Sequence, residues 1–342
     1  MHAWKNSAAL YRLVILAYLV ATVSILGAST TASAQACGTL KKHPKGGYQH
    51  VIWIWMENHN YDQIIGSSSA PYINSIATQC GVATNFHNLT HVSLGNYIGA
   101  VTGLPLLDTT THQDLQPFLL DCILSGPADP CNTPAPSIFE IVPSWKAYVE
   151  SMTANCQATC ATPPCYIVGY AVRHNPPPFL TNLASTCGMF DVPYTDLQAD
   201  LNSDQLPAFA FITPDTVNDM HDGADPGAIQ NGDNWLSAEL PKILNSAAYT
   251  SGKTVVFITF DEGEIPGGDD IGKDCANNTT DADCHIATIV VSPFTKPGTQ
   301  YGKKPFNHYS MLRTTEELLK VKKKNWVGLS KKAKSMKSAF HL

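Results

Sequence analysis

Short apolar runs that alternate with helical stretches constrain the fold of this sequence more than any other feature. The runs are Val51–Met56, Ala208–Thr213, Thr254–Phe260 and Ile286–Ser292. Their lengths and their β-branched and aromatic residues are typical of buried strands. The helical stretches are Pro71–Gln79, Asn234–Asn245 (with Asp233 or Asn234 as its cap) and Ser310–Lys320. This alternation predicts an α/β protein, a three-layer sandwich with a mostly parallel central sheet.

Polar side chains follow three of these runs where each strand ends. The three sets are Glu57-Asn58, Asn218–Asp222 and Asp261-Glu262. Any one of them alone would be typical of a loop or a helix cap. Ligands of open α/β sheets bind at the carboxyl ends of the strands, so parallel strands would gather all three sets at one edge. Crowded carboxylates need a cation, shared protons or hydrogen-bond donors. A metal ion is the simplest solution, and it would act as a Lewis acid on a phosphoryl group.

A serine suited to nucleophilic attack lies in the stretch Thr90–Tyr97. Ser93 is placed to cap a helix that runs through Ala100, and the N-terminus of a helix favours an anion. A serine hydroxyl beside a metal ion can lose its proton and attack phosphorus in line. A plain N-cap serine is the commoner case. His308 also precedes a helix, where a buried histidine that holds a loop is the ordinary alternative.

The N-terminus predicts export from the cell. Lys5 and Arg12 precede the apolar run Leu13–Leu26, and Ala32-Ser33-Ala34 forms a small-x-small cleavage pattern. Residues 1–34 are therefore predicted to be a signal peptide cleaved near Ala34, and the mature protein to be secreted, extracellular or periplasmic. An uncleaved anchor is the alternative.

The cysteines fit an oxidising compartment. The chain has 10 of them, all beyond the predicted signal peptide, and an even number in an exported chain indicates disulfides. Cys275 could pair with Cys284, and Cys122 with Cys131, each closing a small loop. The spacing of Cys156, Cys160 and Cys165 would also suit a zinc cluster, but Pro163, Pro164 and the compartment favour bridges.

Two regions depart from the strand–helix pattern. Residues 106–187 are rich in Pro and Cys, and are expected to form an insertion or lobe tied by disulfides that shapes the cleft. Residues 321–342 form a basic C-terminal tail, expected to be a solvated, frayed end, with peripheral contact with an anionic membrane as the alternative. The formal net charge of -6 gives no reason to expect nucleic acid as a partner.

Five blocks in chain order carry a family resemblance. They are MENHNYDQIIG (56–66), Ala70–Gly103, FITPDTVNDMHDG (211–223) with QNGDNWL (230–236), VVFITFDEGE (255–264) and NHYSMLRTTEELL (307–319). The sequence resembles the phosphoesterase family of the alkaline phosphatase superfamily, which holds secreted acid phosphatases and phospholipases C. The resemblance implies an alkaline-phosphatase-like phosphoesterase domain over residues 35–320.

The resemblance also implies a role for each matching position. By it, Ser93 is the nucleophile, and the metal ligands are Glu57, Asn58, Asp261, Glu262 and Asp222. His91, His221 and His308 line the pocket with Asp222, as acid–base groups or as ligands of a second ion. Asn96 and Asn218 contact substrate oxygens. The family often has His-Pro-Ser-x-Pro-Asn around the nucleophile, whereas this chain has Val92 and Gly95 at the proline positions. Gly95 is expected to loosen the turn.

The implied reaction is phosphoryl transfer in two steps. Ser93 would attack the phosphate and expel the alcohol, His221 or His308 would protonate the leaving oxygen, and water would hydrolyse the phosphoserine. The substrate would be a phosphorylated small molecule or a phospholipid, cleaved as a phosphomonoester or, alternatively, by a phospholipase C-type diesterase. The ligand set favours calcium, magnesium or manganese, and histidines among the ligands would favour zinc, iron or manganese.

Two other functions compete with this interpretation. A serine carboxylester hydrolase would use Ser93, Asp261 and His308 in that chain order, but His91 stands where its G-x-S-x-G elbow has glycine. It also leaves Glu57 and Glu262 unexplained. A non-catalytic binding protein on the same fold would have lost Ser93, Asp261 or Glu57, and all three are present. A sulfatase would need a C-x-P-x-R site, which the sequence lacks.

Overall fold

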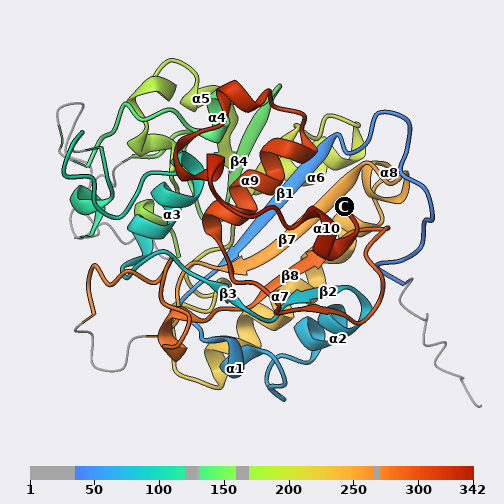
Figure 1. Cartoon of the computed structure of the whole chain (residues 1–342). Coiled ribbons are helices and arrows are strands. Elements are labelled where there is room, and N and C mark those ends of the chain that lie inside the picture. Colours follow the sequence, from blue (N-terminus) through green and yellow to red (C-terminus); the bar gives the residue numbers. More distant parts are fainter. Residues whose placement is uncertain (1–34, 112, 120–128, 130, 159–168, 265–269) are drawn as a thin grey trace, which may run out of the picture. The chain divides into compact units, whose positions relative to one another are not determined.

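The computed structural model describes residues 35–342 except 112, 120–128, 130, 159–168 and 265–269, and the predicted signal peptide lies outside this range. An eight-stranded sheet runs through it in the order β5-β4-β6-β1-β7-β8-β2-β9, and β10 pairs with β3 separately (Figure 1). The strands are β1 (His50–Met56), β2 (Gly81–Ala83), β3 (Phe86–His87), β4 (Trp145–Val149), β5 (Asp191–Pro193), β6 (Phe209–Thr213), β7 (Thr254–Phe260), β8 (Thr288–Val291), β9 (Thr299–Tyr301) and β10 (Phe306–Asn307).

The centre of the sheet is parallel. Strand β1 lies between β6 and β7 and pairs in parallel with both, and β4 pairs in parallel with β5 and β6. Strand β8 is the exception, since it runs antiparallel to both β7 and β2. The four predicted strands are all present, and the predicted α/β fold with a mostly parallel sheet is confirmed.

Helices cover both faces of the sheet. The α-helices are α1 (Tyr61–Ile64), α2 (Pro71–Gln79), α3 (Ser93–Thr102), α4 (Ile138–Ile141), α5 (Cys187–Phe190), α6 (Asp196–Asn202), α7 (Gly227–Leu244), α8 (Ala247–Thr250), α9 (His308–Leu318) and α10 (Lys337–Phe340). The 3-10 helices are η1 (Gln116–Phe118), η2 (Val172–His174), η3 (Pro177–Phe179), η4 (Thr181–Leu183), η5 (Ala282–Cys284), η6 (Lys323–Asn325) and η7 (Gly328–Lys331).

Strand β1 shows how the two helical layers are built. Successive side chains of a strand point to opposite faces. Trp53 donates its indole N–H to Thr315 of α9, and the Trp55 ring lies 4.7 Å from that of Tyr97 of α3. Met56 points the other way, because its Cε would lie 2.9 Å from a Cβ added at Gly232 of α7. Helices α3 and α9 therefore cover one face and α7, packed against α2, covers the other (Figure 1).

The predicted helices occur with some shifted ends. Helix α2 has the predicted bounds, whereas α7 begins at Gly227 after Pro226, so neither Asp233 nor Asn234 caps it. Asp233 instead accepts hydrogen bonds from the backbone N–H groups of Tyr72 and Ile73, at 3.0 and 2.8 Å, and so caps α2.

The region 106–187 contributes to the sheet as well as to the surface. Strand β4 lies inside it and pairs with both β5 and β6. A disulfide joins Cys156 to Cys187, which rules out a zinc cluster that uses Cys156. Cys131 is also disulfide-bonded. The predicted Cys122–Cys131 bridge, like Cys160 and Cys165, involves cysteines outside the described residues.

The expectation of a frayed C-terminal tail is wrong. Met336 and Phe340 are fully buried, and Thr295 donates a hydrogen bond to the carbonyl of Phe340 at 2.9 Å. The guanidinium of Arg313 lies 3.8 Å from the centre of the Trp326 ring. Apolar residues interspersed among the lysines provide this attachment, and the lysine side chains extend toward solvent from the same segment.

Two further disulfides tie the described chain together. Cys37 pairs with Cys80 and, as predicted, Cys275 with Cys284. None of the helices in the described ranges is long and apolar enough to cross a membrane.

Candidate active site

Three acidic residues meet at the carboxyl ends of β1, β6 and β7. The backbone N–H of Asp261 donates to the carbonyl of Met56 at 2.9 Å, and that of Glu57 donates to the carbonyl of Asp219 at 2.8 Å. Asn58, with a positive φ of 44°, turns its N–H onto Asp261 Oδ1 at 3.0 Å. Hydrogen bonds that continue past the strand ends thus hold Glu57, Asp219 and Asp261 together, as parallel strands require.

Helix α3 directs two hydroxyl groups at Glu57. Ser93 Oγ donates to Glu57 Oε2 at 3.2 Å, and Tyr97 donates its phenolic O–H to Glu57 Oε1. Ser93 and Tyr97 are four residues apart and therefore share one face of the helix. Ser93 is the first residue of α3 and Val92 is its N-cap, so Ser93 is not a plain N-cap serine.

Gly95 packs closely, in contrast to the expected loosening of the turn. It lies within α3, and a Cβ at this position would come within 2.9 Å of Thr90 Cγ2 and 3.3 Å of Leu119 Cδ2. The missing side chain thus lets the loop before Ser93 lie against the helix.

The buried carboxylates of the cluster repel one another, and a bound cation would offset this repulsion. Burial raises the pKa of Glu57, Asp219 and Asp261 above their ordinary values, and repulsion from Asp261 and Asp219 raises that of Glu57 further. Asp219 Oδ2, Asp261 Oδ2 and Asn58 Oδ1 are buried and make no hydrogen bond within the described part of the chain. Buried carboxylate and amide oxygens of this kind are suitable ligands for a hard divalent cation.

His174 joins this cluster from η2. Its Nδ1 lies 3.2 Å from Asp219 Oδ2, its Nε2 lies 3.4 Å from Glu57 Oε2, and its ring stacks on that of Tyr97. Burial holds the pKa of His174 well below its ordinary value, with Arg173 and His221 adding to the effect. The imidazole is therefore neutral, and Glu57, His174 and Asp219 form a group that could hold a metal ion.

The sequence predicts no role for His174, Asp219, Tyr97 or Arg173. His174 follows no predicted strand and lies in the irregular region 106–187. The run Arg173-His174-Asn175 before a proline was the available signal. Asp219 belonged to a predicted polar set, but its neighbours His221 and Asp222 were chosen instead.

His221 and Asp222 form a separate pair at the edge of the cluster. His221 Nδ1 lies 2.9 Å from Asp222 Oδ1, and its Nε2 lies 3.0 Å from a guanidinium nitrogen of Arg173. The His221 ring lies 5.6 Å from that of His174, which places it one layer further out. The Asp222 side chain is 48 % exposed and also accepts a hydrogen bond from Thr216, so the structure does not bring it to the carboxylates.

The two predicted substrate-binding amides are occupied by other contacts. Asn218 donates its amide N–H to Glu150 Oε2 at 2.9 Å. Asn96 Oδ1 accepts from the backbone N–H groups of Leu89 and Thr90, and its Nδ2 donates to the Thr90 carbonyl. Asn96 therefore holds the loop that leads to Ser93.

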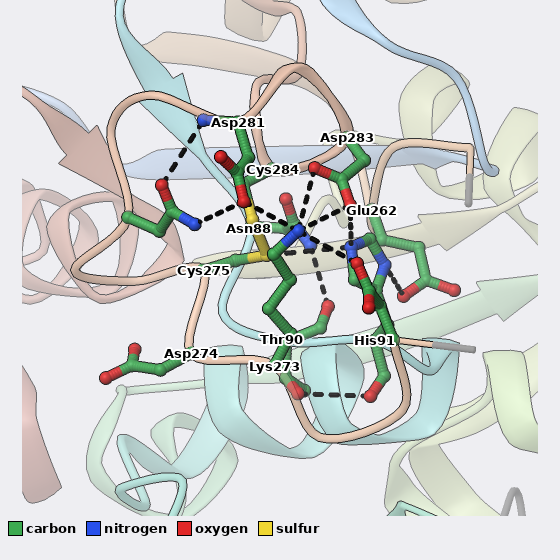
Figure 2. Close-up of a disulfide and its surroundings, with 12 residues drawn as sticks. Asn88, Thr90, His91, Glu262, Lys273, Asp274, Cys275, Asp281, Asp283 and Cys284 are labelled. Atoms are coloured by element: carbon green, nitrogen blue, oxygen red, sulfur yellow. Dashed lines mark hydrogen bonds and ion pairs between the residues drawn. A yellow bond between two sulfur atoms is a disulfide. The ribbon is translucent and has the colours of Figure 1, made fainter. Parts of the chain in front are cut away.

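His91 and Glu262 pair directly. His91 Nδ1 lies 2.9 Å from Glu262 Oε2, and both residues are buried (Figure 2). Glu262 also accepts a hydrogen bond from Asn96 Nδ2 at 3.4 Å. This pair joins the loop before Ser93 to the segment after β7.

His308 supports the end of β7 from the first position of α9. Its Nε2 donates to the backbone carbonyl of Asp261 at 2.8 Å, and burial lowers its pKa to about 4. The ring packs 4.8 Å from that of Trp55. Because His308 faces the carbonyl of Asp261 and not its carboxylate, the structure does not form the triad that a carboxylester hydrolase would need.

Known proteins are similar to this chain in both sequence and fold. The model of the family described as the phosphoesterase family matches residues 140–322. A phosphatidylinositol-3-phosphatase of Mycobacterium tuberculosis is 26% identical over 271 residues, which are 79% of this chain and 77% of that protein. A probable acid phosphatase of Kluyveromyces lactis is 28% identical over 73% of this chain, and the match spans only 56% of that longer relative.

Solved structures share the fold at low sequence identity. The lipoteichoic acid synthase LtaP of Listeria monocytogenes superposes with a TM-score of 0.52 and 11% identity, over 82% of this chain and 74% of that one. The PsFucS1 sulfatase of a Pseudoalteromonas species gives a TM-score of 0.52 and 12% identity, over 83% and 71%. These likenesses concern the architecture.

Proposed function

This chain belongs to the phosphoesterase family and is a phosphoric ester hydrolase, and from that premise we propose that it is a secreted phosphomonoesterase with Ser93 as its nucleophile. The observation that carries the proposal is the hydrogen bond from Ser93 Oγ to Glu57 Oε2 at 3.2 Å, made at the N-terminus of α3. The hydroxyl has an acceptor for its proton, and the helix N-terminus favours the anionic phosphate that would lie beside it.

In the first step, Ser93 Oγ passes its proton toward Glu57 Oε2 and forms a bond to phosphorus, while the bond from phosphorus to the alcohol oxygen breaks. Burial and its carboxylate neighbours raise the pKa of Glu57, which makes it a stronger base than an exposed glutamate. Tyr97 donates a hydrogen bond to Oε1, the other oxygen of Glu57, and so keeps Oε2 directed at the serine. In the second step, water attacks the phosphoserine, phosphate leaves and the proton returns to Ser93.

A divalent cation fits this site. Glu57, Asn58, Asp219 and Asp261 would hold it, with His174 and Glu262 as further candidates, and it would supply positive charge to the phosphate oxygens. An all-oxygen set favours calcium, magnesium or manganese, and the participation of His174 would favour manganese or zinc.

Two imidazoles are candidates for protonating the leaving alcohol. His174 lies nearer to Ser93, through Glu57, whereas both nitrogens of His221 have partners, Asp222 and Arg173. Arg173 adds a guanidinium, a group whose planar fork suits a phosphate. We therefore propose that the neutral His174 takes the serine proton from Glu57, 3.4 Å away, and passes it to the leaving alcohol oxygen. Arg173 would orient the phosphate, with His221 as its support.

The names of the relatives, acid phosphatase and phosphatidylinositol-3-phosphatase, support a phosphomonoester substrate. A phospholipase C-type diesterase would use the same nucleophile. Only the relative rates on monoester and diester substrates distinguish it from a phosphomonoesterase. Export is supported by the disulfides of the described chain and by the N-terminal apolar run Leu13–Leu26.

The test is hydrolysis of p-nitrophenyl phosphate by the purified mature protein from acidic to neutral pH, beside bis(p-nitrophenyl) phosphate and p-nitrophenyl butyrate. We expect release from the monoester that is lost in Ser93→Ala and in chelator, and restored by a divalent cation. Faster release of p-nitrophenol from the diester than from the monoester would show that the enzyme is a phosphodiesterase. Butyrate cleavage without phosphate release would overturn the proposal.

A further inference from the structure

A series of polar contacts leads from the surface to Glu262. Lys273 Nζ lies 2.9 Å from Asp283 Oδ2, the same oxygen lies 3.6 Å from His91 Nε2, and His91 Nδ1 lies 2.9 Å from Glu262 Oε2 (Figure 2). The four side chains come from three segments: the loop before α3, the segment after β7 and the disulfide loop 270–284.

Burial along this series rises toward the active site. The Lys273 side chain is 22% exposed and that of Asp283 11%, whereas His91 is fully buried and Glu262 nearly so. Lys273 is therefore the solvent-facing end of a series whose other end follows Asp261 directly. A lysine that served only solubility would need none of these partners.

Three carboxylates fix the Lys273 ammonium. Besides Asp283 it contacts Asp281 at 2.7 Å and Asp270 at 2.9 Å. Hydrogen bonds to Asp281 and Asp283 raise the pKa of Lys273, so its charge is retained across the physiological range. Without that charge the three carboxylates would repel one another. The repulsion would favour conformations in which the Asp283 side chain no longer contacts His91.

The disulfide loop is also fastened to the loop that carries the nucleophile. The N–H of Gly272 donates to the carbonyl of His91 at 2.6 Å, that of Cys275 to Leu89 at 3.0 Å, and that of Asn88 to Cys284 at 3.2 Å. The Cys275–Cys284 bridge closes the loop at this point, and Cys275 Sγ lies 3.6 Å from His91 Nε2 (Figure 2). The two loops thus form one unit, two residues from Ser93.

We propose that Lys273 is a positioning residue of the phosphoesterase site, acting through Asp283 and His91 to fix the carboxylate of Glu262. This inference rests on the proposed function. It gives His91 a different role from general acid–base catalysis, because both of its nitrogens face protein groups and none faces the space above Ser93. Outer contacts of this kind commonly change metal affinity or activity by about 10–100-fold when removed.

The experiment compares Lys273→Met with Lys273→Arg, which keeps the charge, and with Lys242→Met, which removes a surface lysine paired only with Glu239 in the described structure. Each mature protein is assayed for kcat and KM with p-nitrophenyl phosphate, for Mn²⁺ binding by calorimetry, and for the midpoint of thermal unfolding. For Lys273→Met we expect kcat to fall about 10-fold with KM within about 3-fold, and Mn²⁺ to bind about 10-fold more weakly. Lys273→Arg should recover most of both losses, and Lys242→Met should match the parent.

A double-mutant comparison tests the route. If Lys273 acts through Asp283, then Lys273→Met should add little to the effect of Asp283→Asn on kcat and Mn²⁺ affinity. Additive losses would overturn the relay. So would a Lys273→Met variant with parental kcat and Mn²⁺ affinity, or equal losses in the Met and Arg variants.

Failure of the proposed function is recognised separately. A parent that binds Mn²⁺ but releases no phosphate would refute the phosphatase, while the Mn²⁺ measurements would still decide whether Lys273 positions Glu262. If the parent is active without Mn²⁺, the kcat values of the Lys273 variants decide whether Lys273 positions Glu262. A parent that does neither would overturn both proposals.

Discussion

Ser93 Oγ lies 3.2 Å from Glu57 Oε2, and this contact joins the first residue of α3 to the residue that follows β1. The two groups are 36 residues apart in the chain, and they meet because α3 covers the face of the sheet toward which Trp55 points. The proposed nucleophile is thereby placed at the sheet edge where the carboxylates gather.

Tyr97→Phe should slow the enzyme while leaving it folded. The phenol donates to Glu57 Oε1, and without it one oxygen of a buried carboxylate loses its donor. We expect kcat to fall about 10-fold and stability to fall by about 2 kcal/mol, as for a hydrogen bond to a charged group. Urea unfolding and p-nitrophenyl phosphate kinetics measure the two effects. Tyr61→Phe, whose hydroxyl makes no hydrogen bond in the described structure, is the control, and equal losses in both variants would contradict the assignment.

His174→Asn should impair catalysis more than any substitution at an exposed histidine. The variant removes the imidazole that faces both Glu57 and Asp219, and loss of a general acid typically costs about 10²-fold in rate. Steady-state kinetics on p-nitrophenyl phosphate measure kcat, and a substrate with a better leaving group should be affected less because it needs less protonation. His341→Gln, on the exposed C-terminus, should match the parent. An equal loss for good and poor leaving groups would argue against an acid role.

The strand pattern predicted the architecture because each central strand is a continuous apolar run. Val51–Met56 and Thr254–Phe260 are buried on both faces, so they carry the strongest signal in the sequence. The meeting of Glu57 with Asp261 then followed from parallel pairing alone. The position of Ser93 at a predicted helix start made it a candidate nucleophile, and the family resemblance favoured that role over a plain helix-capping serine.

The choice between Asp219 and Asp222 depended on geometry that the sequence does not encode locally. Met220 has a positive φ of 85°, and the reversal of the chain there leaves Asp219 buried and Asp222 at the surface. His174 was missed for a related reason. It reaches the site on a 3-10 helix in an irregular region, and only long-range packing brings that helix beside α3.

The C-terminal segment was mispredicted because lysine content dominated the interpretation. Phe340→Ala should therefore destabilise the protein by about 3–5 kcal/mol, since the ring is fully buried and its removal leaves a cavity. Ser338→Ala, an exposed change in the same helix, should alter stability by less than about 0.5 kcal/mol. Urea unfolding followed by tryptophan fluorescence compares the two variants. A Phe340→Ala variant as stable as the parent would show that the C-terminal segment is frayed in solution.

Asp191 should make stability fall as the pH rises. Burial raises its pKa from 3.8 to about 7, and its contact with Asn175 only partly offsets that effect. Between these two values the folded state keeps a proton that the unfolded state has lost, so the free energy of unfolding decreases with rising pH across this window and is constant above it. Asp191→Asn cannot lose a proton and removes this dependence. The variant should gain up to about 4 kcal/mol relative to the parent between about pH 4 and about pH 8. Urea unfolding of both proteins at several pH values measures the difference. Because other buried acids such as Glu316 titrate equally in both proteins, a difference that stays constant with pH would show that Asp191 ionises normally in the fold.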